Sequence, residues 1–138
     1  MRKSFFVLLV LVLVACAFIS CKNEPEEKTV AGTWINHYSE DGYVVDSTLV
    51  LGKDGSAKLT SSGSDTEDGI TTQMSGEMTG TYTTTSDTEG TIVFTSGTAT
   101  ITIGGVSETE TMPSSMTYTF TWDGADTLVY DGDEYTRK

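Results

Sequence analysis

Hydrophobic and polar residues alternate along most of the chain from residue 29 to residue 138. The clearest case is residues 117–122, where three aromatic side chains alternate with three threonines. A period of two is typical of a β-strand with one buried and one solvated face. Residues 99–103 repeat the pattern with isoleucine and threonine. Both segments are therefore predicted to be strands of a sheet that is wet on one side.

The same reasoning predicts further short strands, and glycine-containing pairs predict the turns between them. The additional strands are expected at residues 32–38, 48–51, 56–59, 71–78, 81–85, 91–95, 127–130 and 134–137. Breaks are expected at Asp41-Gly42, Asp68-Gly69, Glu89-Gly90, Gly104-Gly105, Asp123-Gly124 and Asp131-Gly132. Residues 52–55 should form a tight turn in which Asp54 and Gly55 supply positive φ values. Two polar segments, residues 61–69 and 107–115, are predicted to be loops projecting from the sheet.

These elements predict an all-β fold. About eight to ten short strands with sequential turns imply an antiparallel up-and-down arrangement. Closure into a small barrel is favoured over a sandwich, because a barrel leaves no exposed edge to protect. About 110 residues make one domain of ordinary size. No internal repeat is present, which argues against a propeller or a solenoid.

The N-terminal segment has a different character. Arg2 and Lys3 precede an apolar run from residue 5 to residue 15 that continues almost unbroken to Ile19. A basic start followed by a short apolar run is typical of an export signal. The run is shorter than the ~20 residues of a spanning helix, although an uncleaved anchor helix is the alternative. The predicted organisation is a signal peptide over residues 1–20, a tether over 21–28 and a barrel domain over 29–138.

Both cysteines of the chain lie in this N-terminal segment, which excludes a disulfide framework for the domain. Each cysteine ends a tetrapeptide that resembles the lipobox of bacterial lipoproteins. Cleavage before Cys21 is favoured, because it leaves a charged tether, whereas cleavage before Cys16, the alternative, leaves exposed apolar residues. The resemblance implies acyl chains such as palmitate, each buried methylene adding about 0.8 kcal/mol of membrane affinity. Lys22 follows Cys21 where an inner-membrane lipoprotein would carry aspartate, so the expected location is the outer membrane of a cell envelope, on its periplasmic or exposed side.

The charge of the domain excludes some partners. The sequence has eight basic and 20 acidic residues, and removal of residues 1–20 takes away Arg2 and Lys3, leaving six basic residues and a net charge of about −14. Such a surface repels nucleic acid and anionic lipid headgroups. Membrane contact is therefore expected through the covalent lipid alone.

Candidates for catalysis are few. His37 is the only histidine, so a serine triad or a zinc site is improbable. Glu108 and Glu110 have the spacing of one solvated strand face rather than of an acid/base pair. Residues 131–134 have too few oxygen ligands in sequence for a calcium loop and should form a turn. We expect no enzymatic activity, no cofactor and no metal.

A family resemblance starts at Gly32-Thr33-Trp34. This Gly-x-Trp sequence, the short strands behind it and Arg137 near the end of the chain resemble the lipocalin-like barrels of many bacterial lipoproteins. The resemblance implies that Trp34 closes the base of the barrel and that Arg137 packs on its ring as a cation–π pair. The chain departs from the lipocalin pattern in having no room for a C-terminal helix.

These observations predict a non-catalytic envelope lipoprotein that binds a small apolar, neutral ligand or a partner protein. A neutral ligand is expected because none of the four basic residues of the domain remains to bind an acidic group: each is expected in a turn, on the outside of the barrel, against Trp34 or at the end of the sequence. A protease-inhibitor-like or structural surface protein with a filled barrel is the alternative, because aromatic residues can fill a barrel this small. Residues 112–116 should place one of two methionines in the barrel mouth. The aromatic candidates for lining a ligand site are Trp34, Tyr82, Phe94, Tyr118, Phe120 and Trp122.

Overall fold

The computed structural model describes residues 29–138, which form nine β-strands and no helix. The predicted lipidation site Cys21, its alternative Cys16, and the predicted signal peptide and tether lie outside the described residues. The strands are β1 (Gly32–Glu40), β2 (Tyr43–Leu51), β3 (Ser56–Glu67), β4 (Ile70–Thr84), β5 (Glu89–Ile103), β6 (Val106–Thr111), β7 (Met116–Trp122), β8 (Thr127–Tyr130) and β9 (Asp133–Arg137).

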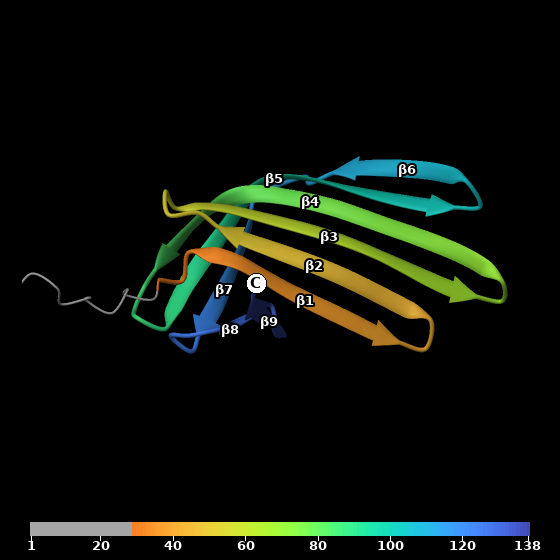
Figure 1. Ribbon diagram of the computed structural model, residues 1–138. Coiled ribbons are helices and arrows are strands. Elements are labelled where there is room, and N and C mark those ends of the chain that lie inside the picture. The colour runs from red at the N-terminus through yellow and green to blue at the C-terminus, as the bar shows by residue number, and fades with distance from the viewer. Residues whose placement is uncertain (1–28) are drawn as a thin grey trace, which may run out of the picture.

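Eight of the strands close into an antiparallel barrel in the order β1-β2-β3-β4-β5-β7-β8-β9, and β1 pairs with β9 to complete the circle. The predicted up-and-down barrel is confirmed. The closing ladder is short, with Trp34 opposite Arg137 and Ile35 opposite Thr136. The ninth strand, β6, pairs with the distal part of β5, while β7 pairs with the proximal part of β5. Figure 1 shows the consequence: β1 to β6 run on well beyond the short strands β7, β8 and β9.

The molecule therefore has two parts. In the closed half, all eight barrel strands surround a common core. In the open half, the hairpins β1–β2, β3–β4 and β5–β6 continue as a six-stranded sheet with no opposite wall among residues 29–138. The open half comprises residues 36–47, 61–76 and 98–111.

Two-residue turns account for the hairpin geometry. Asp41, Asp68 and Asp131 have φ values of 45°, 51° and 51°, and each is followed by a glycine with positive φ. Gly104 and Gly105 form a fourth turn of this kind, with φ values of 58° and 84°. Positive φ at both central positions is typical of the type I′ turn, whose twist matches that of the flanking strands. The predicted breaks at these four pairs are confirmed.

Two turn predictions need correction. The break expected at Glu89-Gly90 is wrong, because both residues lie in β5 and the chain turns just before them. Gly90 is buried, and a β-carbon there would collide with the Phe120 ring. In the turn at residues 52–55, only Gly55 has positive φ; Asp54 instead accepts hydrogen bonds from the backbone amide and hydroxyl of Ser56. These bonds hold the pKa of Asp54 below its ordinary value.

Seven of the eight barrel strands contribute buried side chains to the core of the closed half, and Met78 and Tyr82 of β4 pack against it. Trp34, Leu49, Ile92, Phe94 and Leu128 are completely buried. Tyr130 and Tyr135 pack with ring centroids 6.0 Å apart, and burial raises the pKa of both phenols above the ordinary tyrosine value. The remaining core members are Val30, Leu51, Ala57, Leu59 and Phe120. Side chains thus fill the closed half along its axis, as is usual for an eight-stranded barrel of this size.

The two segments predicted to be loops are largely strand. Residues 61–67 extend β3, and the chain turns only at Asp68-Gly69. Residues 107–111 belong to β6, so only residues 112–115 form a loop. The strands expected at 71–78 and 81–85 are one strand, β4, and those at 91–95 and 99–103 are one strand, β5. These polar segments show no hydrophobic alternation, but they are strands because their backbones pair with neighbouring strands.

Candidate binding surface

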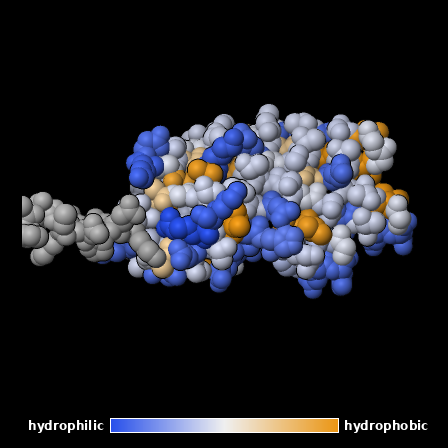
Figure 2. Space-filling view, in the orientation of Figure 1, coloured by the Kyte–Doolittle hydropathy of each residue, from blue (hydrophilic) through white to orange (hydrophobic). Residues whose placement is uncertain are grey.

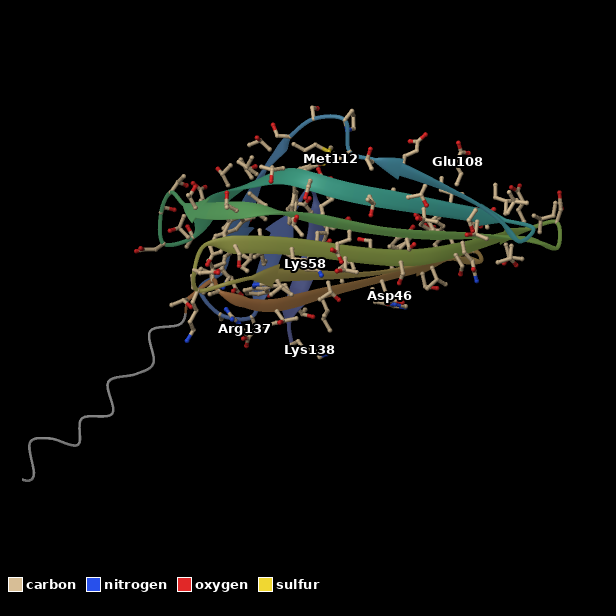
Figure 3. All side chains as sticks on the ribbon, turned by 90° about the horizontal axis from the view of Figure 1, so that it is seen from above. Asp46, Lys58, Glu108, Met112, Arg137 and Lys138 are labelled. Carbon is tan, nitrogen blue, oxygen red and sulfur yellow. The ribbon has the colours of Figure 1, made fainter. Side chains whose placement is uncertain are left out.

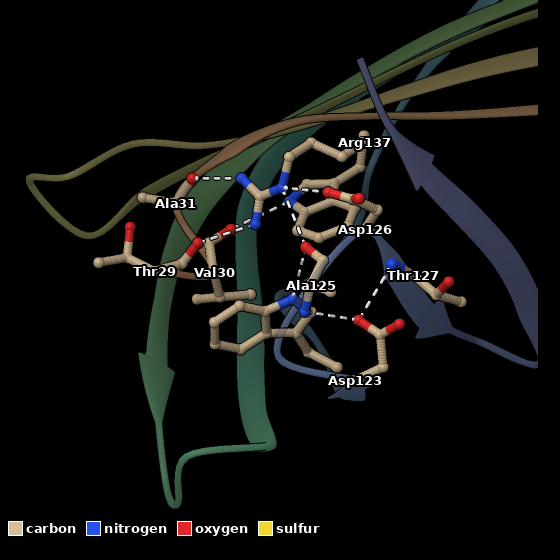
Figure 4. A network of polar contacts seen from close by, with 10 residues as sticks. Thr29, Val30, Ala31, Asp123, Ala125, Asp126, Thr127 and Arg137 are labelled. Carbon is tan, nitrogen blue, oxygen red and sulfur yellow. Dashed lines mark hydrogen bonds and ion pairs between the residues drawn. The ribbon is translucent and has the colours of Figure 1, made fainter. Parts of the chain in front are cut away.

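Trp34 and Arg137 meet at the base of the closed half, as the sequence resemblance implies. The guanidinium carbon of Arg137 lies 4.3 Å from the centroid of the Trp34 ring, and Nε1 of Trp34 donates to the carbonyl of Val30 at 3.0 Å. Arg137 also donates to three backbone carbonyls: Nη1 to Ala31 at 3.0 Å, Nη2 to Thr29 at 2.8 Å and Nε to Ala125 at 3.2 Å (Figure 4). These bonds join the segment before β1 to the loop between β7 and β8.

Gly32 is small because Arg137 passes directly over it. A β-carbon on Gly32 would lie 2.5 Å from Nη1 of Arg137. The neighbouring loop is ordered by Asp123, whose carboxylate accepts hydrogen bonds from the backbone amides of Ala125 and Thr127 at 2.8 and 3.1 Å (Figure 4). These bonds hold the pKa of Asp123 below its ordinary value. Each of these groups has a structural partner, so the base is a structural network.

The aromatic ligand candidates divide into two groups. Trp34, Phe94 and Phe120 lie in the packed core, and Tyr118 is packed against it. Tyr82 and Trp122 line a depression of about 1410 Å³ at the base, and the Tyr82 hydroxyl donates to the carbonyl of Gly52. The predicted placement of one methionine is also observed, since Met112 packs against the core and Met116 is exposed. The structure brings these aromatic side chains together as packing partners.

The open half presents a different surface. We define the inner face as the face of the sheet that continues the core side of the closed half, and the outer face as the opposite one. Six large hydrophobic residues of the open half are exposed. By strand alternation and register, all six belong to the inner face. They are Tyr38, Tyr43, Ile70, Ile101, Ile103 and Val106.

Their exposure is substantial. Ile101, Ile103, Ile70 and Val106 are 46%, 51%, 59% and 75% exposed. Ile103 lies directly opposite Val106 in the ladder, and Tyr38 packs edge-on against Tyr43 with ring centroids 6.0 Å apart. Hydrophobic side chains are visible among hydrophilic ones at the far end of the open half in Figure 2. The six residues form two groups on this face, the tyrosine pair on β1 and β2 and the aliphatic residues of β4, β5 and β6, with Asp65 and Thr72 between them. Exposed apolar side chains grouped on one face are typical of an interaction site.

The outer face of the same strands is polar. Four pairs of hydroxyl groups bridge neighbouring strands, at distances between 2.7 and 3.1 Å. The pairs are Thr66 with Thr71, Thr79 with Ser96, Thr100 with Thr109 and Thr102 with Ser107. His37 also lies on this face, exposed, with Nδ1 2.6 Å from the Asp46 carboxylate. The two faces of the open half therefore differ, and the apolar one is not covered by any described residue.

Charge separates the two halves. The open half contains eight acidic residues and no lysine or arginine. All four basic residues of the domain lie elsewhere: Lys53, Lys58, Arg137 and Lys138. Figure 3 shows Glu108 out on the open half, and Arg137 and Lys138 on the closed half. Glu108 and Glu110 lie on the inner face opposite Ile101 and Ala99, which makes one border of the apolar surface acidic.

Fold and surface together define a small closed antiparallel β-barrel with an open sheet extension. Among residues 29–138, no group of histidine, cysteine, aspartate and glutamate side chains could hold a metal ion, and no helix is long and apolar enough to cross a membrane. Comparison with protein-family models, with curated proteins and with solved structures yields no match.

Sequence reasoning missed the inner face of the open half. Ile101 and Ile103 were expected to lie in a strand, but Ile70 and Val106 bordered segments expected to be loops. Two sequence features indicate this surface: the pairs Asp68-Gly69 and Gly104-Gly105. Each pair predicts a two-residue hairpin turn, which requires strands on both sides.

Proposed function

We propose that the protein is a non-catalytic, lipid-anchored binding module of the bacterial cell envelope, built on a lipocalin-like barrel, that binds a partner protein through the inner face of its open half. The observation that carries the proposal is the gathering of all six exposed large hydrophobic residues of the open half on one face. The closed half supplies the rigid base, and the tether precedes Thr29 at that base.

The packing of the closed half favours a protein partner over a small ligand. A carrier needs an empty lumen, with volumes of ~300 Å³ or more for most ligands. Here core side chains occupy the axis of the barrel, and the depression beside Tyr82 and Trp122 is open to solvent at the base rather than enclosed in the lumen. A purely structural surface protein gains nothing from leaving Ile103 and Val106 exposed, because exposed apolar surface carries an aggregation risk. A protease-inhibitor-like function is one form of the proposed activity, in which the partner is a protease.

Site-specific photocrosslinking in intact cells tests this function. A benzophenone amino acid at Ile101 or Ile103 should give a discrete crosslinked product, because these side chains face the proposed partner. The same amino acid at Thr60 or Ser62, on the outer face of β3, is the matched control and should give none. Equal crosslinking from both faces, or none from either, would contradict the proposal.

Titration with small lipids provides a second test. A long-chain fatty acid and its uncharged alcohol should both bind only weakly, with Kd above about 10 μM, because the closed half is filled and Arg137 is already bonded to three carbonyls. Native mass spectrometry of protein purified without detergent would detect either complex. Sub-micromolar binding of the alcohol would support the small-ligand alternative, and sub-micromolar binding of the acid would also contradict the expected preference for neutral ligands.

A further inference from the structure

The edge of the sheet beside the exposed isoleucines is unpaired. Among the described residues, β6 forms a ladder with β5 only. All six residues of β6 are exposed. An unpaired edge presents a row of backbone donors and acceptors to which another extended chain can add.

The register of β6 shows which backbone groups face this edge. The two-residue turn at Gly104-Gly105 makes Ile103 and Val106 a hydrogen-bonded pair, so the amides and carbonyls of alternate residues from Val106 onward point to β5. The amide of Met112, which continues this series, donates to the carbonyl of Gly97. The amides and carbonyls of Ser107, Thr109 and Thr111 therefore point to the open edge.

Resting on the function proposed above, we infer that the partner contributes an extended segment of alternating apolar and basic residues, which adds to the open edge of β6 as a further strand. Its backbone would pair with Ser107, Thr109 and Thr111. Lysine or arginine side chains on the inner face would lie beside Glu108 and Glu110, with their alkyl stems toward the exposed isoleucines. The apolar side chains of the segment would lie on the outer face, beside Ser107, Thr109 and Thr111. Opposite charges at neighbouring strand positions stabilise a sheet, whereas like charges destabilise it.

The same charges disfavour the other occupants. A second copy would bring its own Glu108 and Glu110 against the acidic open half, which contains eight acidic residues and no lysine or arginine. The predicted tether, residues 21–28, is also unsuitable, since it carries three glutamates, two lysines and a proline. It precedes Thr29 at the base and spans at most about 28 Å when fully extended. The turn at the far end of β4 lies ~33 Å beyond Gly80, at the strand rise of 3.3 Å per residue. The tether is therefore too short to run along the open half from the base to its far end.

A peptide-binding assay tests the inference. The probe is a fluorescent ten-residue peptide that alternates lysine with valine, titrated against the full-length protein in neutral lipid nanodiscs. Saturable binding is expected, and it should be lost when glutamate replaces lysine in the peptide or when its alternate backbone nitrogens are methylated. Binding of the glutamate peptide with equal affinity would overturn the charge argument, and equal binding of the methylated peptide would overturn strand addition.

Variants of the protein locate the site. Glu108→Gln combined with Glu110→Gln should weaken binding about three- to tenfold, the range for two exposed cross-strand ion pairs. Asp87→Asn combined with Glu89→Gln removes the same charge with the same spacing at the base, and should leave binding unchanged. Equal weakening by both double variants would mean that net charge alone attracts the peptide, which would overturn the site.

Proline substitutions separate the two open edges. Thr109→Pro removes an amide that faces the open edge of β6 and spares the ladder to β5, so it should abolish binding while the melting temperature stays within a few degrees. Ser39→Pro makes the corresponding change at the distal edge of β1 and should leave binding unchanged. Loss of binding only in Ser39→Pro would move the site to β1 and overturn the inference.

The remaining outcomes distinguish this inference from the proposed function. If no peptide binds while crosslinking from Ile101 persists, the partner is of another kind and only the inference fails. If crosslinking also fails, the proposed function fails with it. Sedimentation of the protein alone provides the last check, because a dimer that Thr109→Pro dissociates would make a second copy the occupant.

Discussion

Replacing Trp34 with alanine should lower the free energy of unfolding by about 3–5 kcal/mol, the usual range for truncating a buried aromatic side chain. Trp34 is completely buried and pairs across the closing ladder with Arg137. The variant loses the packed ring, the hydrogen bond to the Val30 carbonyl and the surface on which the guanidinium rests. Urea denaturation followed by far-ultraviolet circular dichroism measures the loss.

Ile35→Ala is the matched control for this prediction. Ile35 is the next residue of β1, pairs with Thr136 in the same ladder and is 40% exposed on the outside of the barrel. Its truncation should cost less than about 1 kcal/mol. A loss below ~1 kcal/mol for Trp34→Ala itself would mean that the tryptophan does not hold the base together, and the lipocalin-like interpretation would lose its main support.

Replacing Cys21 with alanine should remove the protein from the membrane fraction or leave it unprocessed. The predicted lipid is the anchor, and two or three acyl chains bind a bilayer stably where a single chain does not. The domain has no other means of attachment in this proposal, since its net negative charge repels anionic headgroups. Metabolic labelling with radioactive palmitate, followed by fractionation, measures both the modification and the location.

Cys16→Ala distinguishes the two possible lipidation sites. Labelling should persist in Cys16→Ala and vanish in Cys21→Ala. The reverse pattern would move the modified residue to Cys16 and lengthen the tether by five residues. Labelling in neither parent nor variants would contradict the lipoprotein assignment as a whole.

Much of the fold could be predicted from short-range patterns. The alternation in residues 117–122 and the turns at Asp41-Gly42 and Asp131-Gly132 are local features, and the structure has them where they were expected. The contact between Trp34 and Arg137 was predicted from a resemblance, because no local pattern joins residues 103 positions apart. That contact is confirmed by the geometry of the base.

The open half could not be predicted, for a physical reason. Its sheet is wet on both faces, so burial does not impose a hydrophobic alternation on residues 61–67 or 107–111. Those strands are held by their backbone ladders and by hydroxyl pairs such as Thr100 with Thr109, which a polar sequence does not distinguish from a loop. The proposed binding surface also depends on β6 and β7 sharing one side of β5, which is a property of the whole topology.

The order of the strands along the chain also determines which ladders of the barrel can form first during folding. Nearly every strand pairs with its neighbour in the chain, so most contacts have low sequence separation and can form as local hairpins within microseconds. There are two exceptions: the ladder of β5 with β7, which skips β6, and the ladder of β1 with β9, which joins the two ends of the domain. The β9 residues of that ladder, Thr136 and Arg137, follow all the other strands of the domain in the chain. The barrel therefore cannot close until β9 has been synthesised, and a chain without residues 136–138 would lack both pairs of the closing ladder.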